Sequence, residues 1–343
     1  MHEHPSARRD PARRMEDPVR RSLVLAGWLV AALAMVAQAC GPIGRPDAAR
    51  PGAVADLGTP ATSSVRGSPA PSPLPAPSPS PSSNVFVTGT RRLVPTAPPA
   101  LAFELTRTTL ALRRSIADWV RRGHPSTQRP PRALVLQALY QQRIYRVMAR
   151  HPRLAMRTVP RLPRLLVREA RRNTSALANL FSLPGPIRRP RVLLQTRPPL
   201  PAGLLFRYYR QAERRFGVSW AVLAAVNFVE SKFGRVRTAS PAGARGPMQF
   251  LPSTWGIYGL GGDIDDPHDA ILGAANYLRA SGAPASYRRA LYVYNHAVPY
   301  VNAVLQYARQ MLRRPQDFLE YYDWQVFVIT PSGEKRLTGP RPR

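Results

Sequence analysis

Cysteine is almost absent from this sequence: among 343 residues only Cys40 carries a thiol. A single thiol excludes an intramolecular disulfide and a cysteine-based metal site, so the folded part must be held together by its core. The histidines are also few and show no spacing typical of metal ligands; they lie at positions 2, 4, 124, 151, 268 and 296. We therefore expect no metal site.

Acidic residues are scarce as well. The chain has 50 Lys plus Arg against 19 Asp plus Glu, a net charge of +31, and nearly all of the cations are arginine. A chain with this balance binds polyanions, which leaves nucleic acid, anionic lipid and anionic cell-wall polymer as candidate partners. The 39 prolines and 22 glycines indicate that much of the chain is not compact.

The N-terminus favours an exported protein. Residues 1–21 are rich in arginine, and residues 22–39, SLVLAGWLVAALAMVAQA, carry no charge and end in small residues, as an export signal does. Cys40 follows directly and resembles the lipidation cysteine of bacterial lipoproteins, although Ala37 stands where those signals usually have Leu. Plain cleavage after Ala39 and an uncleaved spanning anchor remain alternatives. In each case we expect the protein at the outer face of the membrane or in the wall, and no nucleic-acid partner.

Composition divides the chain into five parts. The export signal (1–39) is followed by a Pro/Ala/Ser linker (40–100), which is too polar and proline-rich to fold. Residues 101–200 are predicted to form helices at about 101–122, 132–150 and 161–182, with 21 arginines against three acids. This segment is either a helical collar docked on the following domain or an electrostatic contact to anionic membrane or wall polymers.

The rest of the chain is predicted to be mainly α-helical. Residues 201–316 contain capped helices at about 202–216, 286–294 and 299–313, and one more that begins at Pro267 after an N-cap at Asp266. There is no parallel-sheet pattern. Residues 317–343 are predicted to hold a short hairpin that turns at PSGE.

One carboxylate stands at an unusual place. The pattern predicts a helix from an N-cap at Ser219 to a stop at Gly234, with an apolar arc that includes Val226, Val229 and Phe233. Glu230 falls inside this arc. Burial there would raise its pKa, as a general acid requires; alternatively, Glu230 lies at the rim of the arc and points into water.

Other chemistries find little support. Between Glu230 and Asp263 there is no carboxylate, and GGDIDDPHD reads as helix capping because it lacks the loop and closing Glu of a calcium hand. Ser231 has no evident His and Asp partners for an acyl-transfer triad. A single Glu opposite the glycine-rich loop TASPAGARGPMQ remains.

Three motifs carry a family resemblance. ES at 230–231, GPMQF at 246–250 and YVYN at 292–295 are similar, in order and spacing, to the lytic transglycosylases related to goose-type lysozyme, over about residues 218–312. The resemblance implies a lysozyme-like helical domain that cleaves the β-1,4 bond between N-acetylmuramic acid and N-acetylglucosamine in peptidoglycan glycan strands. It also implies one catalytic Glu, no cofactor and a 1,6-anhydromuramyl product.

The resemblance also assigns residues. Glu230 is expected to be catalytic, and six others are expected to bind substrate: Ser231, Gly246, Met248, Gln249, Tyr294 and Asn295. Two positions depart from the family pattern, with Pro247 in place of Leu and Val293 in place of Ala. Pro247 lacks an N–H, which argues against a backbone contact to sugar there.

Two rival functions stay open. A lysozyme-type hydrolase on the same fold would need a second carboxylate, from Asp263, Asp265 or Asp266, to hold a water. A non-catalytic wall-binding module would only grip the glycan. In every case we expect a monomer.

Overall fold

The computed structural model describes residues 92–123, 125–183, 194–330 and 333–340. The predicted export signal, Cys40 and nearly all of the linker lie outside these residues. Within the described part of the chain, none of the helices is both long enough and apolar enough to cross a membrane.

The structure is mainly helical, as the sequence predicts. The described part of the Arg-rich segment forms the α-helices α2 (Pro98–Arg121), α3 (Arg132–Arg150), α4 (Pro152–Thr158) and α5 (Arg164–Ser182), with a short 3₁₀ turn, η4 (Val159–Arg161), before α5. Prolines occupy the first turns of α2 and α4, where a missing N–H costs nothing. The predicted helix at 161–182 begins three residues later because Pro163 is the residue that precedes its first turn.

Within the described residues, the second half of the chain contains seven helices and a two-stranded sheet. The helices are α6 (Ala202–Phe216), α7 (Trp220–Ser231), α8 (Pro252–Tyr258), α9 (Pro267–Ala280), α10 (Tyr287–Tyr294), α11 (Val298–Arg313) and α12 (Asp317–Tyr322). The strands β1 (Phe327–Thr330) and β2 (Gly333–Arg336) pair antiparallel, with Phe327 opposite Arg336. This pairing confirms the predicted C-terminal hairpin.

Two further local predictions differ from the structure. Helix α7 ends at Ser231 instead of Gly234, because Lys232, Phe233 and Gly234 all adopt positive φ angles that end the helix. Helix α12 lies in a segment that was predicted to be only hairpin and tail. Its six residues are too few for a helical period to be recognised in the sequence.

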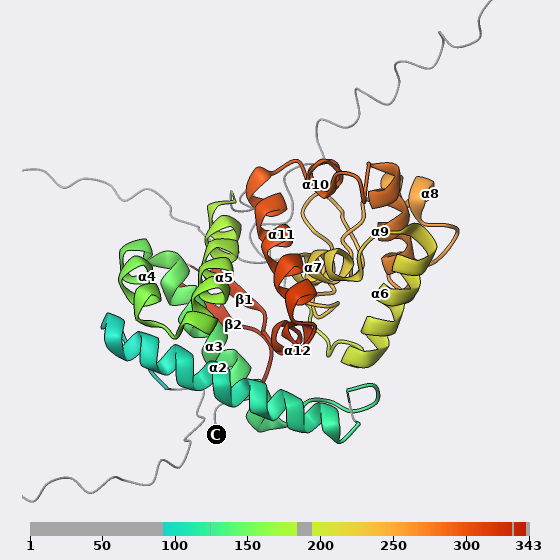
Figure 1. Cartoon of the computed structure of the whole chain (residues 1–343). Helices are drawn as coiled ribbons and strands as arrows, with labels where there is room; N and C mark the ends of the chain where they lie inside the picture. The colour runs from blue at the N-terminus through green and yellow to red at the C-terminus, as the bar shows by residue number, and fades with distance from the viewer. Residues whose placement is uncertain (1–91, 124, 184–193, 331–332, 341–343) are drawn as a thin grey trace, which may run out of the picture. The chain divides into compact units, whose positions relative to one another are not determined.

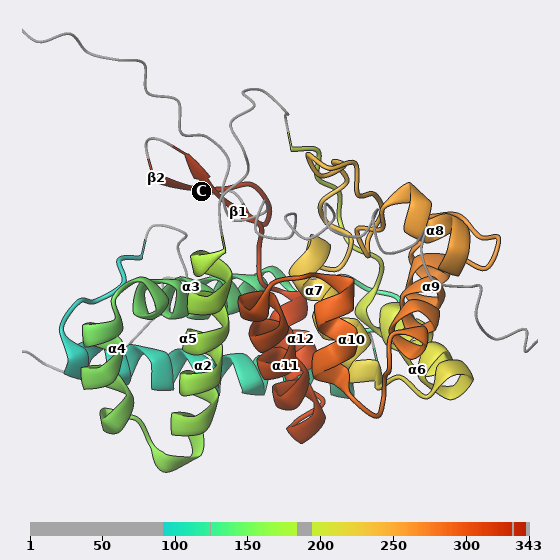
Figure 2. The same cartoon turned by 90° about the horizontal axis from the view of Figure 1, so that it is seen from above.

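Helix α11 is central to the packing. Helices α5 and α7 both pack against it, and α6 packs against α7 and α9 (Figures 1 and 2). The Arg-rich segment is therefore docked on the second half of the chain through α5, as the collar interpretation expects. The same arrangement makes α7 a buried helix, because α6, α9, α11 and α12 all contact it.

Candidate active site

Glu230 lies inside the protein. All twelve residues of α7 are buried, and the side chain of Glu230 is only 1% exposed. The prediction that Glu230 belongs to the buried arc is confirmed, and the alternative that it points into water is wrong. The physical reason is that α7 is covered by several helices at once and has no face left for solvent.

A tyrosine from another helix holds the carboxyl group. The hydroxyl of Tyr300, in the first turn of α11, donates a hydrogen bond to Oε1 of Glu230 at 2.9 Å. Burial raises the pKa of Glu230 to about 8, against the smaller opposing effects of this hydrogen bond and of the charge of Lys232. Glu230 is therefore protonated at neutral pH, which suits a general acid.

Sequence reasoning did not find Tyr300. An aromatic residue in an apolar helix most often belongs to the core, and Tyr300 is itself fully buried there. Only the packing of α11 against α7 brings its hydroxyl to Glu230.

The glycine-rich loop turns sharply at Gly246. Its φ is +74°, and a Cβ at this position would lie 1.9 Å from the carbonyl oxygen of Ile264. Arg245 and Phe250 pair across the turn, and the side-chain Nε2 of Gln249 donates to the carbonyl of Gly246 at 3.0 Å. Glycine is thus required at 246 by the close approach of the loop to the backbone of Ile264, in the segment before α9.

A buried polar network fastens the loop to α7. The carbonyl of Pro247 accepts hydrogen bonds from Nδ2 of Asn227 at 2.7 Å and from Oγ of Ser231 at 2.6 Å. Oδ1 of Asn227 in turn accepts from the hydroxyl of Tyr209, on α6, at 2.6 Å. The sequence does not identify Asn227 and Tyr209 as site residues, because neither lies in one of the three motifs that carry the family resemblance.

Ser231 also has a structural role at the end of α7. Its Oγ accepts a hydrogen bond from the N–H of Gly234 at 2.8 Å, and the side chain is fully buried. Ser231 therefore links the end of α7 to the loop. Its predicted contact with substrate stays a prediction.

Met248 and Tyr294 join the loop to α10. The side chain of Met248 is fully buried, and its carbonyl accepts a hydrogen bond from the hydroxyl of Tyr294 at 2.7 Å. Burial raises the pKa of Tyr294 well above its usual value, and the charge of Glu230 raises it further. The charge of Glu230 thus acts on Tyr294, although the hydroxyl of Tyr294 donates its hydrogen bond to the loop.

Asn295 follows the last residue of α10. Its N–H donates to the carbonyl of Leu291 at 2.9 Å, while its side chain is 4% exposed. Oδ1 of Asn295 is buried and makes no hydrogen bond within the described residues. The structure thus leaves one buried acceptor at this position without a partner, and no hydrogen bond joins Asn295 to Glu230 in the described chain.

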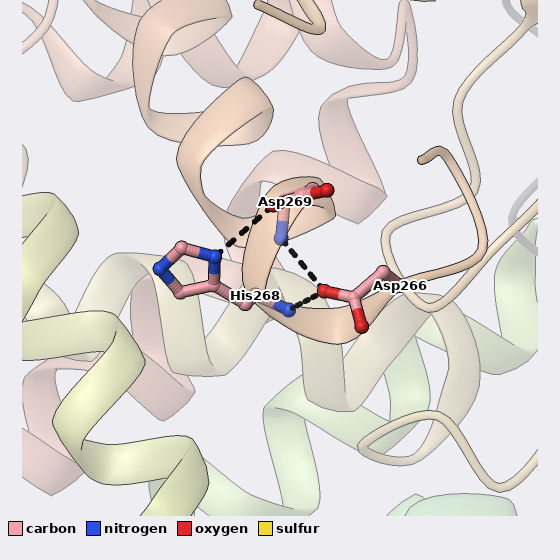
Figure 3. Close-up of side chains that lie close together, drawn as sticks. All are labelled: Asp266, His268 and Asp269. Carbon is pink, nitrogen blue, oxygen red and sulfur yellow. Dashed lines mark hydrogen bonds and ion pairs between the residues drawn. The ribbon is translucent and has the colours of Figure 1, made fainter. Parts of the chain in front are cut away.

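The acidic stretch after residue 262 is a helix cap. Asp266 accepts hydrogen bonds from the N–H groups of His268 at 2.8 Å and Asp269 at 3.1 Å, while Nδ1 of His268 lies 3.0 Å from Oδ1 of Asp269 (Figure 3). The other carboxylate oxygen of Asp269 accepts from the N–H of Asp263 at 3.0 Å. Potential ligand atoms of Asp266, His268 and Asp269 lie within 4.8 Å of one another. Because capping bonds hold them there, the cluster needs no metal to explain it.

None of these aspartates makes a hydrogen bond to Glu230 in the described residues. Asp265 forms an ion pair with Arg245, and Asp263 accepts from the N–H of Asp265 at 2.9 Å. Among the described residues, only Tyr300 and Lys232 influence the pKa of Glu230 besides burial. In the described residues, no other carboxylate is among the groups that shift the pKa of Glu230.

Comparison with known proteins places this site within a recognised domain. Residues 207–313 match the family model of the transglycosylase SLT domain, and this range contains Glu230, the loop and Tyr300. The chain is also similar to membrane-bound lytic murein transglycosylase F of Thiobacillus denitrificans, with 37% identity over 87 residues. The similarity covers 25% of this chain and 18% of that relative, so the homology is distant and partial. No solved structure matches the chain.

Proposed function

We propose that this protein is a peptidoglycan lytic transglycosylase that cleaves the β-1,4 bond between N-acetylmuramic acid and N-acetylglucosamine. The carrying observation is the buried carboxyl group of Glu230, which Tyr300 holds inside a range that matches the SLT domain. Its pKa of about 8 keeps it protonated at neutral pH, and in the described residues no other carboxylate is among the groups that shift this pKa.

In the first half-reaction Glu230 acts as general acid. Its proton passes to the glycosidic oxygen as the bond from that oxygen to C1 of the muramyl sugar breaks. Glycosidases that lack a second carboxylate can use the N-acetyl oxygen of the substrate to stabilise the positive charge that develops at C1. Tyr300 then stabilises the new Glu230 carboxylate, because a hydrogen bond to a charged acceptor is stronger than one to a neutral acceptor.

In the second half-reaction the same group acts as general base. The Glu230 carboxylate accepts the proton of the muramyl 6-hydroxyl as its oxygen bonds to C1. This closes the 1,6-anhydro ring and returns Glu230 to its protonated form. No water is consumed, which agrees with a site that needs only one carboxylate.

The loop and α10 would position the glycan. The buried Oδ1 of Asn295 has no hydrogen-bond partner among the described residues and could accept one from a substrate N–H or hydroxyl. Gln249 and Met248 belong to the loop that Asn227 and Ser231 hold in place. Substrate contacts of Ser231, Gly246, Met248, Gln249, Tyr294 and Asn295 remain proposals.

Product analysis tests the function. Purified peptidoglycan would be digested with the protein and with its Glu230→Gln variant, and the products weighed by mass spectrometry. We expect products one water lighter than reducing-end muropeptides, and none from the variant. If all products carry reducing ends, the protein is the hydrolase. If the protein binds peptidoglycan but releases no product, it is the wall-binding module.

A peptidoglycan substrate implies that the protein acts in the cell envelope. We propose further that the chain is exported and anchored through an acyl group on Cys40, because this lone cysteine follows an apolar run with a basic leader. A Cys40→Ala variant should then leave the membrane fraction after a high-salt wash. Retention of an uncleaved variant in the membrane would instead identify residues 22–39 as a spanning anchor.

A further inference from the structure

Four arginines gather where α5 meets α11. Arg168 and Arg172 lie one turn apart on α5, and Arg309 and Arg313 lie one turn apart on α11. The two helices lie side by side (Figures 1 and 2). Arg168, Arg309 and Arg313 are exposed and Arg172 is half-buried. We call these four residues the α5–α11 arginine patch.

The charges of this patch are not compensated. Burial lowers the pKa of Arg172, and the charges of Arg313, Arg168 and Arg309 lower it further, so the four guanidinium groups repel one another. In the described residues none of the four pairs with a carboxylate; Arg172 donates only to Oε1 of Gln310, at 3.3 Å. By contrast, the inward-facing Arg113 and Arg314 are each paired with two acidic side chains. The patch therefore costs energy in the free protein and offers donors to an external anion.

Exposed leucines accompany these arginines. Leu165 is 65% exposed and shares a helical face with Arg168 and Arg172, at spacings of three and seven residues. Leu312 is 52% exposed and lies beside Arg313 and three residues after Arg309. A soluble anionic polymer would leave these leucines in water, whereas the head-group layer of a bilayer takes up both apolar and cationic side chains.

We propose that the α5–α11 arginine patch binds the phosphate groups of an anionic lipid surface, with Leu165 and Leu312 entering the head-group layer. Guanidinium groups suit this partner because their planar N–H donors match phosphate oxygens in pairs. The patch joins the Arg-rich segment to the SLT-matched range, so lipid contact would also fix the orientation of the domain. Arg309 lies roughly 14 Å along α11 from Tyr300, so the surface and the candidate active site can be occupied together.

Vesicle sedimentation tests this contact independently of the proposed enzymatic activity. The chain from residue 41 onward keeps every described residue but lacks the apolar run and Cys40, which could bind lipid by themselves. It would be mixed with phosphatidylglycerol or phosphatidylcholine vesicles at low and high salt. We expect binding to phosphatidylglycerol only, weakened by salt because exposed charges are screened.

Two quadruple variants distinguish the effect of the α5–α11 arginine patch on vesicle binding from the effect of net charge. One changes Arg168, Arg172, Arg309 and Arg313 to Gln, and the matched control changes four exposed arginines of α6, namely Arg207, Arg210, Arg214 and Arg215. Since each basic residue near an anionic bilayer contributes up to about fivefold in partitioning, the patch variant should bind at least tenfold more weakly. The α6 variant should lose less than about threefold by the same reasoning. Equal losses would overturn the proposal, because only net charge would then matter.

A leucine variant decides between lipid and polymer. Leu165→Ser with Leu312→Ser should weaken vesicle binding severalfold and leave the binding of inorganic polyphosphate unchanged. If this variant binds vesicles as well as the parent does, the lipid proposal fails, and competition by polyphosphate would then identify a phosphate polymer as the partner. Circular dichroism would confirm that all variants are folded, as expected for exposed positions.

Discussion

Tyr300 and Glu230 join α11 to α7 through one buried hydrogen bond of 2.9 Å. The two residues are seventy positions apart in the sequence, yet the bond shifts the balance between the neutral and ionised forms of the candidate acid toward the ionised form. Burial drives the pKa of Glu230 upward and Tyr300 restrains it. The pair therefore couples the packing of two helices to the proton chemistry of the site.

Replacing Tyr300 with Phe should change the pH profile. The variant loses the hydrogen bond that lowers the pKa of Glu230, so this pKa should rise above about 8. Activity needs the protonated form to begin the reaction, so the alkaline limb of kcat/KM should move to higher pH. The rate at its maximum should fall roughly ten- to a hundredfold, the value of about 1.5–3 kcal/mol for a hydrogen bond to a charged group. An unchanged profile with an unchanged rate would contradict this role of Tyr300.

Glu230 should destabilise the fold as pH rises. Its pKa is about 8 when folded against 4.5 as the reference value, so the folded state holds more protons between these limits. The free energy of unfolding must then fall as pH rises from about 4.5 through about 8. The Glu230→Gln variant has no carboxyl group to ionise at this position and therefore does not lose stability in this way. Its free energy of unfolding should exceed that of the parent by a few kcal/mol at pH 8 and nearly equal it at pH 4.5.

Urea unfolding of both proteins at several pH values measures this difference. Glu169, Asp317 and Asp323 also have raised pKa values, so the parent curve alone cannot be assigned to one group. The difference between parent and Glu230→Gln isolates Glu230. A difference that does not grow with pH would show that the carboxyl group is solvated in solution.

Gly246→Ala should disrupt the loop. The added Cβ would approach the carbonyl oxygen of Ile264 to 1.9 Å, and φ there is +74°. Gly243 offers a matched control, because its φ is +82° and a Cβ there would meet nothing within 4 Å. Gly243→Ala should cost about 1 kcal/mol from backbone strain, and Gly246→Ala clearly more, together with most of the activity. If chemical unfolding shows equal losses of stability for the two variants, the loop can shift to make room for the Cβ at position 246, and the close packing there is not required.

Asn227→Ala should loosen the loop without touching Glu230. The variant removes one donor to Pro247 and leaves the buried hydroxyl of Tyr209 unpaired, at a cost of about 1–3 kcal/mol. Activity should fall because the loop is held less firmly. Asn179→Ala is the control, since Asn179 donates only within its own helix, to Ser175. Similar effects of both variants on stability and activity would argue against the loop-holding role.

The aspartates near α9 should be dispensable for catalysis. Asp266→Ala removes the N-cap and should lower stability by about 1 kcal/mol. Asp265→Asn breaks an exposed ion pair and should cost less. Both should keep activity within a few fold of the parent in peptidoglycan digestion. A collapse of activity in either one would favour the two-carboxylate hydrolase.

The sequence by itself determined the helical class and the hairpin, and it placed Glu230 on the apolar arc of its helix while leaving open whether the side chain points into water. These follow from local patterns: an apolar period of 3.6 residues, a Ser219 cap and alternating strand residues are all readable within one segment. The position of Asp266 as N-cap was readable for the same reason. Its hydrogen bonds reach only the next three residues.

Only the tertiary structure decided which groups meet. Tyr300, Asn227 and Tyr209 serve the site through partners on other helices, and Arg168 and Arg309 come together although they lie on opposite sides of the composition boundary near residue 200. A local pattern predicts which side chains face the core, because the apolar period marks one face of the helix. The partner of that side chain depends on which helix packs there, and this is settled by the complementary shapes of distant segments.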